Sequence, residues 1–98
     1  MIVPAELHFG VLDLETQRSA AEVGGWHRAD RMRISCGVLY DSQKNIFVEY
    51  LEDQIDRLIE NLQRMDLIIG FNIRRFDYLV LKGYSDFDFS VLKVSHST

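Results

Sequence analysis

The feature that most constrains the fold is a change in the spacing of apolar residues near the middle of the chain. Three apolar runs rich in β-branched and aromatic residues come first and are predicted as strands. They lie at residues 7–14, 32–41 and 46–51. Only four residues separate the last two runs, so these strands should be antiparallel neighbours. Apolar residues then recur at helical spacing from Ile55 to Met65, which predicts an amphipathic helix.

The second half of the sequence predicts strand, helix and strand again. Residues 66–72 are a short apolar run, and 74–83 read as a helix that ends at Gly83. Residues 87–94 alternate well enough for a fifth, edge strand. A helix between two strands implies a parallel, right-handed crossover. We therefore expect an α/β fold with a mixed sheet in strand order 3-2-1-4-5, and a long polar loop at residues 16–31.

Composition limits the classes of function. The 98 residues are 47% hydrophobic, which predicts one small globular domain over residues 1–98. The single cysteine, Cys36, excludes an internal disulfide and a cysteine zinc cluster. No apolar run approaches the ~20 residues of a membrane span, and the first residues lack signal-peptide features, so we expect a cytoplasmic protein that binds no membrane. The net charge of −4 gives no overall attraction to nucleic acid unless bound cations reverse the local sign.

Acidic residues follow the predicted ends of two strands that should be neighbours. Asp13 and Glu15 are two residues apart in an extended run, so their side chains point the same way. A parallel strand at 66–72 would bring Asp77 to the same edge of the sheet. Three such carboxylates repel one another unless a cation lies between them, and hard oxygen ligands suit Mg²⁺ or Mn²⁺. We therefore expect these three acids to be the metal ligands and catalytic residues of a two-metal phosphodiesterase, with the first acid bridging both ions.

Two stretches of sequence carry a resemblance to a known family. VLDLET (11–16) and IIGFNIRRFDYLVL (68–81) resemble the first two sequence motifs of the four-acid, proofreading 3′–5′ exonucleases of the ribonuclease H-like superfamily. The resemblance covers roughly residues 7–92, and the spacing of Asn72 to Asp77 looks like that of family B DNA polymerases. It implies a ribonuclease H-like fold that lacks the family's final helices, and a substrate that is the 3′ end of single-stranded DNA or RNA.

The resemblance also implies roles for residues beside the three acids, which match the acids of the two motifs. Thr16 matches a position that contacts the terminal nucleotide, whereas Asn72 and Phe76 would brace the second motif and approach the scissile end. Arg74 and Arg75, at the start of the second predicted helix, either hold a substrate phosphate or are solvated side chains paired with nearby acids.

The third motif of the family, a His or Tyr base four residues before a fourth Asp, has no counterpart in these 98 residues. We therefore expect weak or absent exonuclease activity. His96 is either a base or ligand, or a solvated terminal residue. Trp26 in the polar loop either stacks on a base or anchors the loop by burial.

A second interpretation is a non-catalytic remnant of the fold that binds metal, nucleic acid or another protein. Because the family's final helices would cover part of the sheet, we also expect a homodimer or a partner chain over the face near the first, fourth and fifth strands.

Overall fold

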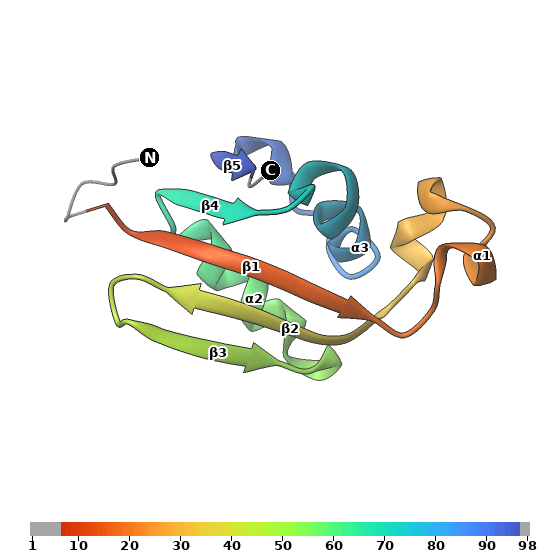
Figure 1. The fold of residues 1–98 in the computed structure, drawn as a ribbon, viewed down its shortest axis with the longest axis horizontal. Helices are drawn as coiled ribbons and strands as arrows, with labels where there is room; N and C mark the ends of the chain where they lie inside the picture. The colour runs from red at the N-terminus through yellow and green to blue at the C-terminus, as the bar shows by residue number, and fades with distance from the viewer. Residues whose placement is uncertain (1–6, 97–98) are drawn as a thin grey trace.

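A five-stranded mixed sheet forms the centre of the protein (Figure 1), in a computed structural model that describes residues 7–96. The strands are β1 (Phe9–Thr16), β2 (Ile34–Asp41), β3 (Ile46–Tyr50), β4 (Leu67–Gly70) and β5 (Val94–His96). Their order is β3-β2-β1-β4-β5. β2 is antiparallel to β1 and β3, and β4 is parallel to β1 and β5. The predicted α/β class and strand order are therefore confirmed.

The helix predicted from the apolar spacing is also confirmed. Helix α2 (Ile55–Gln63) begins directly after a short 3₁₀ turn, Glu52–Gln54, and crosses from β3 to β4 behind the sheet (Figure 1). Its buried side chains are those that recur at helical spacing: Ile55, Leu58, Ile59 and Leu62. None of the helices within residues 7–96 is long and apolar enough to cross a membrane.

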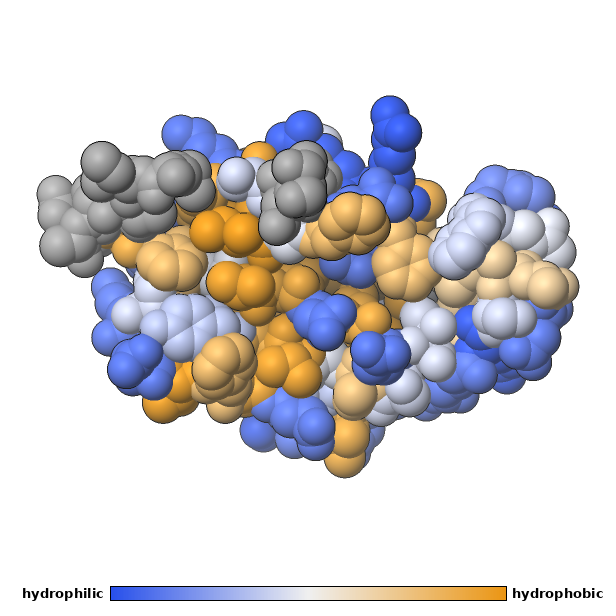
Figure 2. Space-filling view, viewed as in Figure 1, coloured by the Kyte–Doolittle hydropathy of each residue, from blue (hydrophilic) through white to orange (hydrophobic). Residues whose placement is uncertain are grey.

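Burial alternates along β1, as expected for a strand with one face in the core. Leu12 and Leu14 are 3% and 6% exposed, and both belong to the hydrophobic core that includes α2. Asp13 and Glu15 are exposed on the opposite face, which we call the open face. Apolar side chains gather over the middle of the open face, and the described residues leave them uncovered (Figure 2). The sequence prediction that the two acids share one face is confirmed.

The segment 16–31 is more ordered than the predicted loop. It contains helix α1 (Ala20–Val23) and a 3₁₀ helix, η1 (Trp26–Arg31). A capping box begins α1: the backbone N–H of Glu22 donates to Ser19 Oγ at 3.2 Å, and the N–H of Ser19 donates to Glu22 Oε1 at 3.0 Å. The S-x-x-E signal of this capping box is present in the sequence, whereas the prediction of a loop depends on the polar, glycine-containing composition of the segment.

The prediction of a fifth strand at 87–94 is wrong, because β5 begins only at Val94. A 3₁₀ helix, η4 (Phe89–Val91), occupies the middle of that segment. Asp88 caps it, since the backbone N–H and the hydroxyl of Ser90 both donate to Asp88 Oδ1, at 3.1 and 2.6 Å. Phe89 and Leu92 are buried, and their spacing of three fits a helical turn and not an alternating strand.

The predicted helix at 74–83 is shorter and begins irregularly. A π-helical turn, η3 (Ile73–Asp77), leads into helix α3 (Tyr78–Leu81). Lys82 ends α3, and the next residue, Gly83, passes so close to the carbonyl oxygen of Asp30 that a Cβ atom there would collide with it.

Gly70 brings the end of β4 close to β1. A Cβ atom at Gly70 would lie 2.6 Å from Cδ1 of Ile73 and 3.0 Å from the carbonyl oxygen of Leu12. Ile73 is fully buried and has no room to move aside. We expect Gly70→Ala to lower the free energy of unfolding by about 1–3 kcal/mol in urea denaturation. Adding Ile73→Val, which removes the closest atom, should recover part of the loss; equal stability of Gly70→Ala and the parent chain would contradict this.

Candidate functional site

The parallel pair β1 and β4 positions the candidate site. The two strands pair from Phe9 with Leu67 to Val11 with Ile69, so their carboxyl ends lie at the same edge of the sheet. β1 continues beyond β4 and carries the first two acids on this extension. The chain that leaves β4 turns back through η3, which contacts β1 and carries Asp77.

Asp77 is the only charged side chain that is buried among the described residues, at 5% exposure. Burial, and secondly the negative charge of nearby Asp13, raise the pKa of the Asp77 carboxyl from 3.8 to about 7. No hydrogen bond or cation within residues 7–96 lowers this pKa again. The two acids therefore meet in an arrangement that is unfavourable when both are ionised and that a bound cation would relieve.

Glu15 is less well placed than the sequence analysis expected. Within residues 7–96, no group of three His, Cys, Asp or Glu side chains is arranged to hold a metal ion. Glu15 is two residues beyond Asp13 in an extended strand, which places its backbone roughly 6.6 Å further along β1, past the end of β4. The donor set at the edge is thus the carboxylate pair Asp13 and Asp77. This set fits Mg²⁺ or Mn²⁺, which commonly use one or two carboxylates and complete their shell with water and substrate phosphate.

Thr16 and Asn72 have local structural roles of their own. The Thr16 hydroxyl donates to the carbonyl oxygen of Arg18 at 3.0 Å. Asn72 adopts the left-handed conformation, with φ 56° and ψ 34°, which asparagine tolerates better than most residues. Its side chain is exposed and makes no capping hydrogen bond to η3. The left-handed backbone is by itself a sufficient reason for an asparagine at position 72, whether or not its side chain binds a ligand.

The arginines and aromatic residues beside the acids are more accessible than a purely structural role requires. Arg74 and Arg75 are exposed, and no ion pair to either is found within residues 7–96. Phe76 is half-buried and packs edge-to-face with Trp26, with ring centroids 5.7 Å apart. Trp26 itself is 68% exposed, so the interpretation that it anchors the loop by burial is wrong.

Phe71 is the residue near the site that sequence reasoning missed. The sequence predicts it as part of the strand at 66–72, but it follows β4, which ends at Gly70, and it is 75% exposed. The available signal was the Gly70 that precedes it, because a glycine at a strand end often marks a change of direction.

The end of β5 lies at the same edge of the sheet as the acids. The backbone of His96 pairs with Gly70 of β4, so the predicted direction of the fifth strand is confirmed. The side chain of His96 lies outside the described part of the chain, so both interpretations of it, a base or ligand and a solvated terminal residue, stay open.

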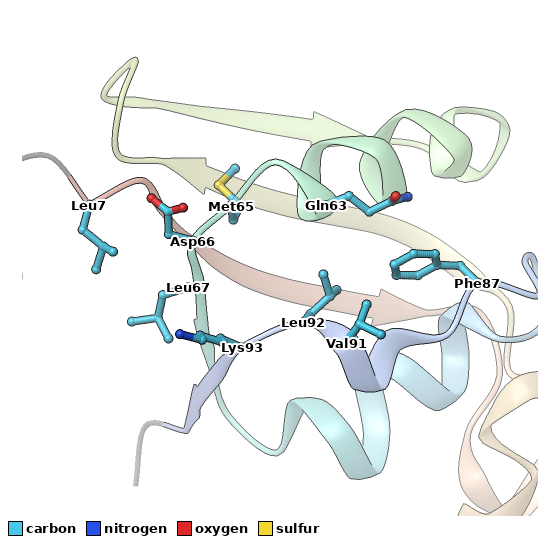
Figure 3. Close-up of a pocket in the computed structure, with 9 residues that line it drawn as sticks. All are labelled: Leu7, Gln63, Met65, Asp66, Leu67, Phe87, Val91, Leu92 and Lys93. Atoms are coloured by element: carbon cyan, nitrogen blue, oxygen red, sulfur yellow. The ribbon is translucent and has the colours of Figure 1, made fainter.

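A hollow lies at the edge of the sheet opposite the acids, at the amino ends of β4 and β5 (Figure 3). Its volume is about 680 Å³, and its lining includes Met65, Leu67, Phe87 and Leu92. Among residues 7–96, the one acid on its wall is Asp66, which accepts a hydrogen bond from the backbone N–H of His8 at 2.9 Å. The described lining of this hollow therefore has no pair of carboxylates like that at the carboxyl ends of β1 and β4.

Comparison of the sequence with protein-family models and with curated proteins finds no match. Functional assignment therefore depends on the residues of this chain and on their arrangement.

Proposed function

We propose that this domain is a metal-dependent phosphodiesterase of the ribonuclease H-like, 3′–5′ exonuclease type that acts on single-stranded DNA or RNA. The observation that carries the proposal is the buried Asp77 beside Asp13, where two adjacent parallel strands end. The strand order and the two sequence motifs support it, because they belong to the same superfamily pattern.

Each acid has a distinct task in this proposal. When bound, Mg²⁺ or Mn²⁺ supplies the positive charge that polarises a phosphodiester and activates a water molecule. Asp13 and Asp77 would hold the ion through their carboxylate oxygens. Glu15, further along β1, is exposed and free to orient a water molecule or to help hold a second ion. Because the carboxylate must lose its proton to bind a cation, and Asp77 has a pKa of about 7, metal affinity should rise with pH through neutrality.

The remaining candidate residues would position the substrate. Arg74 and Arg75 lie on the turn that carries Asp77, where an exposed guanidinium can donate to a substrate phosphate. By resemblance, Thr16 contacts the terminal nucleotide, and Asn72 and Phe76 approach the scissile end.

Binding of a second protein chain without catalysis is the other candidate function. The observation that favours it is the uncovered apolar part of the open face, where Val11 is 38% and Phe47 75% exposed. A second copy of this chain over that face would bury these side chains. Light scattering at high concentration should then give the mass of a dimer, whereas a monomer would favour the first candidate alone.

Manganese titration by calorimetry tests the proposed metal site. At about pH 8 the parent chain should bind Mn²⁺, and Asp13→Asn should bind at least ~10-fold more weakly, because even groups that only support a metal ligand contribute about 10–100-fold to affinity. Glu60→Gln, an exposed acid on α2, is the matched control and should bind as the parent does. Equal affinities for the parent and Asp13→Asn would contradict the assignment.

A further inference from the structure

An open pocket lies next to the acid pair and is lined largely by aromatic side chains. Trp26 comes from η1, Phe71 and Asn72 from the turn after β4, and Arg75 and Phe76 from η3. The pocket has a volume of about 500 Å³. Two segments that are distant in sequence, η1 and residues 71–76, thus place three aromatic rings, a guanidinium group and an amide around one space.

The fold does not depend on the exposed ring of Trp26 to anchor its segment. The segment η1 is anchored by Ala29 and by the next residue after the helix, Met32, which are 0% and 1% exposed. Trp26 remains 68% exposed although Phe76 supports it from one side. Leaving two large aromatic side chains, Trp26 and Phe71, in water forgoes the free energy of burying them, and clustered exposed apolar groups commonly mark binding sites.

The chemistry of the lining selects the ligand. Exposed aromatic faces stack on unpaired bases of any sequence, and a guanidinium group pairs with a phosphate through two hydrogen bonds. An amide such as that of Asn72 both donates and accepts, as the edge of a base requires. Because the chain as a whole has a net charge of −4, binding to a polyanion depends on a local contact of this kind and not on overall charge.

We propose that Trp26 and Phe71 form a stacking site for an unpaired nucleobase of a single strand, with Arg75 holding the adjacent phosphate. The ligand's identity as a nucleic-acid strand rests on the proposed function. Phe76 lines the pocket and the next residue is Asp77, so a strand that enters here approaches the acid pair. The interior bases of a duplex are excluded from this site because they are already stacked on both faces.

Tryptophan fluorescence offers a direct readout, because Trp26 is the only tryptophan in the sequence. A short single-stranded oligothymidylate is titrated into the full chain with a chelator present. Stacking should quench and shift the emission of Trp26. An abasic strand of the same length, which keeps the phosphates and lacks the bases, should leave the emission almost unchanged.

Two phenylalanines of equal exposure provide a matched pair of variants. Phe71 and Phe47 are each 75% exposed, and Phe47 lies on β3, outside the pocket. Phe71→Ala should weaken binding of the oligonucleotide roughly 10-fold or more, and Phe47→Ala should leave it unchanged. Arg75→Gln should weaken binding and reduce its dependence on salt.

The inference is overturned if the abasic strand quenches as well as oligothymidylate, or if Phe71→Ala and Phe47→Ala bind alike. Quenching by an apolar peptide and not by the oligonucleotide would overturn it too and assign the pocket to a protein ligand. Because the assay contains a chelator, Asp13→Asn should keep the quenching. A parent chain that shows the quenching and does not bind Mn²⁺ would refute only the proposed function, and a parent chain that binds Mn²⁺ without the quenching would refute only the stacking site.

Discussion

Replacing Asp77 by asparagine is expected to raise the free energy of unfolding of the metal-free chain at about pH 8, by up to about 4 kcal/mol. The pKa of Asp77 is raised to about 7 in the folded chain, from an ordinary value of 3.8. The folded chain therefore binds this proton more tightly than the unfolded chain does. The bound proton therefore stabilises the folded chain, and this stabilisation is complete below about pH 4. It is lost as the pH rises to about 7, and each unit of pKa shift corresponds to 1.36 kcal/mol of stability. Asparagine has no charge to bury and escapes this loss.

Urea unfolding at about pH 5 and about pH 8, with a chelator present, measures this difference. Asp77→Asn should be more stable than the parent at both pH values, with the larger difference at the higher pH, because the parent has lost only part of the proton's contribution at about pH 5. Glu60→Gln on α2 is the control and should follow the parent at both. Adding Mn²⁺ at about pH 8 should stabilise the parent and not Asp77→Asn, because only the parent keeps both ligands. A parent chain as stable as Asp77→Asn at the higher pH would contradict the burial of an unpaired carboxylate.

The second prediction with a large expected effect concerns the rate of catalysis by a polypeptide of these 98 residues. It supplies three acids and no base that is placed at the site among its described residues, and loss of a general base typically removes ~10²–10⁴-fold in rate. We therefore expect very slow, Mn²⁺-dependent shortening of single-stranded DNA or RNA from the 3′ end, or none. Any residual activity should vanish in Asp77→Ala, which removes a metal ligand.

A time course with a 5′-labelled oligonucleotide measures the activity, with a chelator and Asp77→Ala as parallel controls. Circular dichroism of the variant establishes that it is folded. Glu15→Gln should retain more of the metal affinity than Asp77→Asn does, because Glu15 lies beyond the pair Asp13 and Asp77 on the extension of β1. Rapid, processive shortening by the parent would mean that His96, or a residue of a second chain, completes the site, and the account of an incomplete active site would be wrong.

The order of strands and helices was predictable because it depends on the period of apolar residues. The apolar spacing from Ile55 to Met65 matched helix α2, and the short links matched antiparallel pairing. The fifth strand was not predictable in the same way. Alternation at 87–94 competed with the local cap at Asp88, and burial of Phe89 and Leu92 against the core favoured the 3₁₀ turn. That packing depends on residues distant in sequence.

The candidate site was predictable as far as topology determines it. The closeness of Asp13 and Asp77 follows from two parallel neighbours whose carboxyl ends coincide. The place of Glu15 past the end of β4 does not follow, because it depends on how far β1 extends beyond its paired residues. The exposure of Phe71 depends on the turn at Gly70, where contact with Ile73 and β1 redirects the chain. Such contacts between segments have no signature in the periodicity of one segment.

Nuclear magnetic resonance of the ¹⁵N-labelled chain with added Mn²⁺ tests most directly whether the acid pair binds a metal ion. The paramagnetic ion broadens amide signals close to it, so the site is located without any activity. The account predicts selective loss of signals from residues 12–16 and 70–78, at about pH 8, and their recovery in Asp13→Asn. Broadening centred on the exposed acids of α2, or spread evenly over the chain, would contradict it.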